Sequence, residues 1–446
     1  MIMNEIIKFF LKLHYKNNIL LFFSFIITVS ITSLIFAYFL VSKFNYLFDE
    51  NNNIILKNIP FYYGPVIENL INGKGHYHEV YGFKSYIDRF PFVPIFISIL
   101  SNISTNIYFF LILKNIILFA IFYISLNIFC KDQELGFVYF YTILIILFSN
   151  FYNTTTVLNF IFSDSFIGIF LPSTFLILIS ENKNKFIYVS LILFFLFFMK
   201  TTMFLVAFVI SLVFIILENK VNILKRFMPL IFLIFASILW GSYGYFKTGI
   251  FPIGSKISSS NQLSLATTLN KNFHKYYPEK SVDIIPKETV LGKFQSEWEM
   301  YEYYKKRNNE YIKENKNRIL KDGIIKIKFI LFNTHKDGVH PDIKGQFKNP
   351  FMFSHFFNRL VAILSLIISI LLFLKNVIKL KLKKIDIYFI LFYFSSIIPY
   401  VIGWATSKHL VGIFLVSHIY LLLKILNTKL FKDYINSIIS KIKYQQ

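Results

Sequence analysis

Apolar and polar residues alternate in long blocks along this chain. Ten apolar runs of roughly 14 to 24 residues are separated by polar segments; the runs lie at residues 19–41, 107–130, 136–152, 160–179, 186–199, 203–217, 227–246, 356–374, 387–402 and 410–423. An α-helix needs about 20 apolar residues to cross the hydrocarbon core of a bilayer, so runs of this kind are typical of membrane helices. The pattern predicts an all-α integral membrane protein with about ten transmembrane helices.

Composition supports this class. The 446 residues are 55% hydrophobic, 20% aromatic and only 16% charged, which argues against a water-soluble protein. The net charge of +23 fits cytoplasmic loops and contacts with anionic lipid, so we expect no nucleic-acid partner. Cys130 is the only cysteine, which excludes an intrachain disulfide.

The distribution of Lys and Arg predicts the orientation. The segment "KNVIKLKLKKID" and the tail "KLFKDYINSIISKIKYQQ" are basic, as cytoplasmic segments usually are. We therefore place both termini in the cytoplasm, which puts two long polar segments, residues 42–106 and 247–355, on the outer side of one polytopic domain spanning residues 1–446. Short outer turns are expected at Asn153, Lys200 and Ser407.

Both outer segments contain helical patterns. In "PFYYGPVIENLINGKG", Tyr63, Ile67 and Leu70 have helical spacing, and Gly73 and Gly75 are expected to end this interfacial helix. In the second segment, "SEWEMYEYYKKRNNEYIKENKNRILKDG" predicts a charged, aromatic-rich helix at the membrane surface.

Ionisable residues collect on the outer side in this topology. They fall in five separate stretches of the chain: Asp49, Glu50, Asp88, Arg89, Asp164, Lys200, Lys408 and His409. Charged groups at a membrane edge are costly and tend to face a cavity or one another. We therefore predict a shared polar site built from these residues.

Each of these residues also has a purely structural interpretation. Asp88 and Arg89 can form an ion pair that fixes the loop, and Asp164 can cap a helix. Lys200 can extend from a tight turn into water, and Asp49 and Glu50 can be solvated loop charges. The pair formed by Lys408 and His409 can likewise be a solvated turn.

Several motifs resemble those of GT-C glycosyltransferases, the superfamily of protein O-mannosyltransferases and the lipid A aminoarabinose transferase. The first outer segment is similar through Tyr63, Leu70, the pair Gly73 and Gly75, and the Arg-x-Pro-x-x-Pro formed by Arg89, Pro91 and Pro94. Further matches are "FSDSFIGIFLPSTF" around Asp164, "LWGSYGYFKTGIFPIG", and the pair Lys408 and His409. The chain departs from the family near Ile59, where the leading catalytic Asp would stand; the nearest acids upstream are Asp49 and Glu50.

The resemblance implies transfer of a sugar, hexose or pentose, from a polyprenyl-phosphate donor to a lipid or cell-surface glycan at the outer face of a bacterial inner (plasma) membrane. Cations would hold the donor phosphate, namely Arg89, Lys200, Lys408 and His409. A carboxylate would act as general base in an inverting displacement, with Asp49, Glu50 and Asp164 as candidates and Asp88 as the residue that orients Arg89.

No cofactor is expected. The stretch "HKDGVHPD" carries His335, Asp337, His340 and Asp342, but its spacing matches no strong metal motif, so a divalent ion is not favoured. Two other functions remain open: a transporter or flippase of lipid-linked sugars, which would favour broken or charged helices near the bilayer midplane, and a surface polysaccharide polymerase or ligase.

Overall fold

The computed structural model describes residues 18–43, 45–59, 63–79, 82–131, 136–159, 163–219, 221–252, 294–314, 348–379, 381–402 and 410–429, with single residues at 133, 316, 321, 323, 324, 327, 431, 433 and 437. Within these residues the regular structure is helical, and the β-contacts are isolated bridges. The predicted all-α class is therefore confirmed for this part of the chain.

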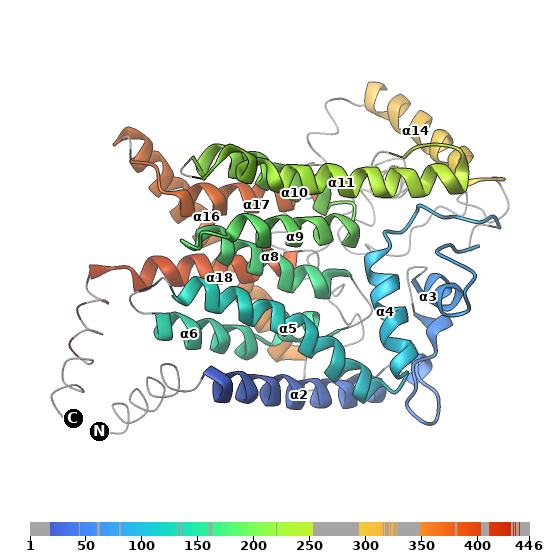
Figure 1. Cartoon of the computed structure of the whole chain (residues 1–446), viewed down its shortest axis with the longest axis horizontal. Helices are drawn as coiled ribbons and strands as arrows, with labels where there is room; N and C mark the ends of the chain where they lie inside the picture. The colour runs from blue at the N-terminus through green and yellow to red at the C-terminus, as the bar shows by residue number, and fades with distance from the viewer. Residues whose placement is uncertain are drawn as a thin grey trace.

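The bundle is built from apolar helices that begin and end close to the predicted runs. They are α2 (Asn18–Lys43), α5 (Ile107–Lys131), α6 (Gly136–Ser149), α7 (Phe151–Leu158), α8 (Ser163–Ile179), α9 (Lys185–Met199), α10 (Met203–Leu217), α11 (Ile223–Thr248), α16 (Lys348–Ile378), α17 (Lys384–Ile402) and α18 (Val411–Leu426). Figure 1 shows these helices lying side by side in one bundle.

Among the described residues, five helices are long and apolar enough to cross a membrane, or six if one bent pair forms a single span. The expected spans at 136–152, 186–199, 203–217 and 410–423 contain shorter apolar helices of 10–17 residues. The membrane character of the chain is thus supported by length and composition, whereas the number of ten spans stays a prediction.

One expectation about the outer turns was wrong. The stretch beginning at Asn153 is not an exposed turn but part of α7, a short helix whose Asn153 and Thr156 are buried. Asn150 caps this helix by accepting a hydrogen bond from the Asn153 amide. The chain then bends by 113° before α8, so α7 and α8 form a broken span or a re-entrant loop.

A lysine inside the bundle holds the end of α7. Lys114 of α5 is fully buried, and its ammonium group donates to the carbonyl oxygens of Val157, Leu158 and Asn159. These are the carbonyls that a helix leaves without partners at its C-terminus, where the helix dipole also favours a cation. Lys114 therefore acts as a C-terminal cap supplied by a neighbouring helix.

The start of α7 is fixed by a buried polar network. Asn150 and Asn358 of α16 are hydrogen-bonded at 2.6 Å, and the Ser354 hydroxyl donates to Asn150 at 2.7 Å. Beside them, the His355 ring stacks on Tyr152 at 4.3 Å, and Arg359 lies 2.7 Å from His355 Nδ1. The short helix is thus bound at both of its ends.

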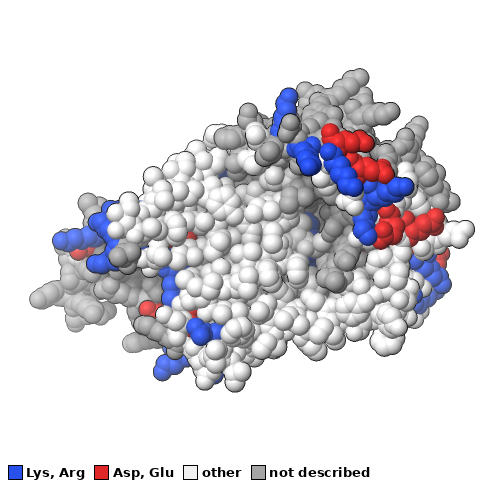
Figure 2. Space-filling model, turned by 90° about the horizontal axis from the view of Figure 1, so that it is seen from above, with Lys and Arg blue, Asp and Glu red and all other residues white. Residues whose placement is uncertain are grey.

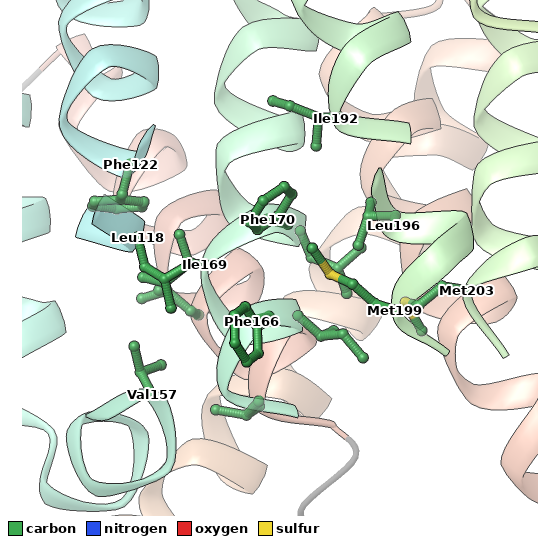
Figure 3. Close-up of a cluster of buried hydrophobic side chains, with 14 of the residues drawn as sticks. Leu118, Phe122, Val157, Phe166, Ile169, Phe170, Ile192, Leu196, Met199 and Met203 are labelled. Carbon is green, nitrogen blue, oxygen red and sulfur yellow. The ribbon is translucent and has the colours of Figure 1, made fainter. Parts of the chain in front are cut away.

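The core around the bent pair is apolar and closely packed. Figure 3 shows side chains from five helices meeting there, labelled Leu118 and Phe122 of α5, Val157 of α7, Phe166, Ile169 and Phe170 of α8, Ile192, Leu196 and Met199 of α9, and Met203 of α10. All of them are buried. In lipid, burial between helices gains no hydrophobic energy, so close van der Waals packing of these side chains holds the core together.

Shorter helices gather at one end of the bundle. They are η1 (Asn45–Leu47), η2 (Leu56–Asn58), α3 (Tyr63–Ile71) and α4 (Phe92–Ile103) from the first predicted outer segment, and α14 (Glu297–Glu314) from the second. Figure 1 places α3, α4 and α14 at the end opposite to the start of α2 and the end of α18. Both predicted surface helices, α3 and α14, are therefore confirmed as helices.

Glycines shape the first of these segments. Gly73 and Gly75 follow α3 with φ angles of +68° and +102°, the left-handed region that glycine tolerates, and so end the helix as predicted. A Cβ on Gly64 would lie 2.4 Å from the Leu56 carbonyl oxygen, which shows how closely η2 approaches α3.

Charged residues also mark the opposite end. Buried Glu218 pairs with Lys185 and with Lys384, each at 3.0 Å, and accepts a hydrogen bond from Tyr388. Lys424 pairs with Asp386 in the same part of the molecule. On the face in Figure 2, described Lys, Arg, Asp and Glu gather at the two ends, and the band between them is uncharged.

Candidate functional site

The centre of the site is an ion pair between two helix ends. Asp164, in the first turn of α8, accepts a hydrogen bond from Lys200 at 3.0 Å, and the Lys200 side chain is 15% exposed. Burial alone would lower the pKa of Lys200, but the Asp164 carboxylate outweighs it and raises that pKa above its ordinary value. Lys200 is therefore a charged partner of Asp164.

Two tyrosines enclose this pair. The Lys200 ammonium lies 5.3 Å from the centre of the Tyr400 ring at the end of α17, and the Tyr400 hydroxyl is 3.0 Å from Thr202 Oγ1. From α3, Tyr63 is hydrogen-bonded to Ser163 and interacts electrostatically with Arg89, Lys200 and Asp164. Burial raises the pKa of Tyr63, so its hydroxyl stays protonated and is available as a donor.

Arg89 reaches the same place from the first outer segment. Its guanidinium is 3.7 Å from Asp88 Oδ2, and its side chain is 18% exposed. On the other side of Asp88, the His78 ring lies 3.3 Å from the same carboxylate oxygen. Burial raises the pKa of Asp88, but Arg89 and His78 outweigh it and hold the pKa below its usual range.

Aromatic side chains hold this part of the chain in place. Phe90 packs against Phe197 of α9 at 5.3 Å and against Trp240 of α11 at 5.2 Å. Phe92 packs edge-on against Phe166 of α8 at 5.6 Å. In "DRFPF" the charged pair is thus followed by two rings that anchor this segment in the bundle.

A hairpin-like contact brings His78 to Asp88. His78 and Ser85 form an antiparallel bridge, with N–O distances of 3.1 and 2.8 Å in the two directions. Just before it, His76 packs edge-on against Trp240, and the Tyr243 hydroxyl donates to the His76 carbonyl at 2.8 Å. Burial lowers the pKa of His76 to about 4, so this ring is neutral at pH 7.

The sequence-predicted residues divide into three groups. Asp88 pairs with Arg89 and Asp164 with Lys200, and Arg89, Asp164 and Lys200 all interact electrostatically with Tyr63. Asp49 and Glu50 are exposed in a turn of their own, where Asp49 accepts hydrogen bonds from the Asn51 and Asn53 amides and from the Asn53 side chain. Lys408 and His409 lie outside the described residues, as does the stretch at 335–342.

Ile59, at the place where the resemblance would put a catalytic acid, is 2% exposed and belongs to the core. Among the described residues, no group of three or more His, Cys, Asp and Glu is arranged to hold a metal ion. Among the described residues of this end, the buried acids that form ion pairs with cations are Asp88 and Asp164.

Sequence reasoning missed four participants. Tyr63 was noted only as part of a motif, and Tyr400 and His78 were not singled out at all. A fourth, Glu297 of α14, reaches the first outer segment from more than 200 positions away. Nothing in the local sequence distinguishes these residues from other tyrosines, histidines and glutamates, because their partners are distant in the chain.

Comparison of the chain with protein-family models, with curated proteins and with solved structures gives no match. The chemical role of the site is therefore inferred from its own residues. Two cations, two carboxylates and a protonated phenol at the end of an apolar bundle are suited to bind an anionic headgroup whose tail remains in lipid.

Proposed function

We propose that this chain is a GT-C-type glycosyltransferase that transfers a sugar from a polyprenyl-phosphate donor to a lipid or cell-surface glycan acceptor at the outer face of the membrane. The observation that carries the proposal is the convergence of Arg89, Lys200 and Asp164 around Tyr63, at the end of the bundle where the outer segments lie. The proposed topology has about ten spans, outer segments at 42–106 and 247–355, and cytoplasmic termini in a bacterial plasma membrane.

In this proposal the cations bind the donor phosphate. Arg89 offers a planar fork that matches two phosphate oxygens, and Lys200 offers a compact charge. As the bond between the anomeric carbon and the phosphate oxygen breaks, negative charge develops on the leaving phosphate, and fixed cations stabilise that charge. Asp88 orients Arg89, since it lies 3.7 Å from the guanidinium.

Asp164 is the proposed general base. In the free protein its carboxylate is paired with Lys200. A phosphate that draws Lys200 toward itself weakens this pair, which raises the proton affinity of the carboxylate. The acceptor hydroxyl then gives its proton to Asp164 while its oxygen forms the new bond to the anomeric carbon, with inversion, and polyprenyl phosphate leaves.

The proposal is tested with purified protein in lipid nanodiscs. Arg89→Ala and Lys200→Ala should each weaken binding of polyprenyl phosphate about tenfold or more, the usual loss for a charge-assisted hydrogen bond. Lys57→Ala removes an exposed cation of the same outer segment and serves as the matched control. Unchanged binding in both site variants would contradict the assignment of Arg89 and Lys200 as phosphate ligands.

The choice of base is tested by transfer from a panel of polyprenyl-phosphate hexoses and pentoses. Asp164→Asn is expected to abolish transfer, while Asp49→Ala and Glu50→Ala retain it because their turn lies apart and exposed. Asp88→Ala is expected to weaken donor binding through Arg89. Full transfer activity in all four variants would contradict the mechanism.

A transporter or flippase of lipid-linked sugars is the second candidate. It is favoured by the 113° bend between α7 and α8 and by the buried amine of Lys114 within α5, since transporters place broken helices and ionisable groups near the bilayer midplane. Movement of a fluorescent polyprenyl-phosphate sugar across proteoliposomes, without any transfer product, would select this function over the enzyme.

A further inference from the structure

A carboxylate from the second outer segment is buried against the first. Glu297, the first residue of α14, is 2% exposed. Its Oε2 atom accepts hydrogen bonds from the Ser85 hydroxyl at 2.7 Å, from the Tyr86 amide at 3.1 Å and from the Ile87 amide at 3.2 Å. Three donors converging on one oxygen form a specific binding arrangement for this side chain.

Glu297 differs from the other described acids of α14 in being buried. Glu299, Glu302 and Glu310 of the same helix are exposed. A glutamate that leaves water loses its hydration, and the hydrogen bonds from the first outer segment offset part of that cost. Together with buried Met300, Glu297 fixes the start of α14 to the site.

The residues that Glu297 holds lie directly before the charged pair of the site. Asp88 and Arg89 follow Ile87 without interruption, and Ile87 is itself buried at 1% exposure. On the other side, the Phe90 ring is anchored between Phe197 and Trp240. The backbone that carries Arg89 is therefore held from both sides, by Glu297 before it and by Phe90 after it.

We propose that Glu297 is a positioning residue, which holds the Ser85–Ile87 backbone so that Arg89 faces the donor phosphate. This inference rests on the proposed function, which identifies the ligand as a donor phosphate. It adds that the second outer segment, through Glu297, completes the site. Loss of the contact frees two amides and a hydroxyl and allows the Asp88–Arg89 pair to turn away from Lys200.

The contact itself is tested by hydrogen–deuterium exchange of the full-length protein in nanodiscs. Glu297→Ala should raise the exchange rates of the Tyr86 and Ile87 amides about tenfold or more, because both lose their acceptor. Glu297→Gln keeps an acceptor oxygen and should retain most of the protection. Glu310→Ala changes an exposed acid of the same helix and should leave both amides unaffected.

The positioning role is tested on the same samples with polyprenyl phosphate as the probe. Glu297→Ala should weaken binding about tenfold, close to the effect of Arg89→Ala, while Glu297→Gln restores it. If wild-type protein binds the probe and Glu297→Ala binds it equally well, the positioning role is wrong. If wild-type protein itself does not bind, the proposed function has failed, and unchanged exchange in Glu297→Ala would refute the contact as well.

Discussion

The charged residues of the candidate site form linked pairs rather than separate solvated groups. Lys200 is bound to Asp164, and Arg89 lies beside Asp88, which also faces His78. Every one of these side chains except Arg89 and Lys200 is almost fully buried. The two cations are thus the groups left accessible, which suits them to meet an anion from outside.

Replacing only one member of the pair between Asp164 and Lys200 should destabilise the protein more than expected from the effect of replacing both. Lys200→Met removes the cation beside the buried Asp164 carboxylate, and Asp164→Asn removes the carboxylate beside the Lys200 ammonium; each change is expected to cost about 3 kcal/mol of stability. The double variant should cost less than the sum, since no unpaired charge remains. Unfolding in detergent by circular dichroism measures all three, and additive losses would show that the two groups act independently.

The contact made by Glu297 should depend on pH. Burial raises the pKa of Glu297 from 4.5 to about 7, and Asp88 adds to the shift. The titratable or charged groups near it are Asp88 with His78 behind it, Tyr243 of α11, and Tyr86 with Lys247 over its ring.

Between pH 4.5 and about 7, the Glu297 carboxyl is protonated when it is buried in the contact but ionised when it is exposed to water. Ionisation therefore favours the exposed state, and the contact weakens as the pH rises from about 5 to about 8. Protection of the Tyr86 and Ile87 amides, corrected for the intrinsic exchange rate, should fall over this range. Glu297→Gln, which cannot ionise, should show a flat profile. A wild-type profile as flat as that of the variant would contradict the assignment.

Among the elements, α7 is the one whose position depends most on its neighbours. It has eight residues, too few for a helix to be stable in isolation. Its C-terminal carbonyls are held by Lys114 of α5, and its start is bound to α16 through Asn150 and Asn358. The bend that follows positions the start of α8, where Ser163 is hydrogen-bonded to Tyr63 and Asp164 pairs with Lys200.

Removing the cap on α7 should loosen the bent pair. Lys114→Met leaves three buried carbonyl oxygens without their donor, and the expected loss is about 3 kcal/mol. Lys131→Met changes an exposed lysine of the same helix and should cost less than about 0.5 kcal/mol. Thermal unfolding in detergent measures both, and equal stability of the two variants would show that Lys114 does not hold α7.

For the whole molecule, the distribution of charge defines two ends. Ion pairs around Glu218 and Asp386 lie at one end, and the site with α3, α4 and α14 lies at the other. The band between them is uncharged on the face seen in Figure 2, as expected of a surface that contacts lipid tails. The two ends are therefore expected to face opposite sides of the membrane.

Cysteine labelling tests this orientation. In a Cys130→Ser background, Lys57→Cys and Glu310→Cys should react with a membrane-impermeant maleimide in intact cells, since both positions are exposed at the end that carries the site. Lys381→Cys, exposed at the other end, should react only after permeabilisation. The reverse pattern would overturn the predicted orientation.

The sequence by itself determined the all-α class, the apolar helices and four of the charged residues that the structure pairs, Asp88, Arg89, Asp164 and Lys200. Those features depend on local composition and spacing: a run such as 107–130 becomes a helix because its backbone must satisfy its own hydrogen bonds in lipid. The break between α7 and α8 escaped prediction because it depends on Lys114, a residue of another helix.

Only the tertiary structure decided which charges act together. It brought Arg89, Asp164 and Lys200 around Tyr63, left Asp49 in its own exposed turn, and added Glu297 from a distant segment. Such pairings depend on how helices pack, and packing depends on contacts between residues far apart in the chain, which no local pattern records.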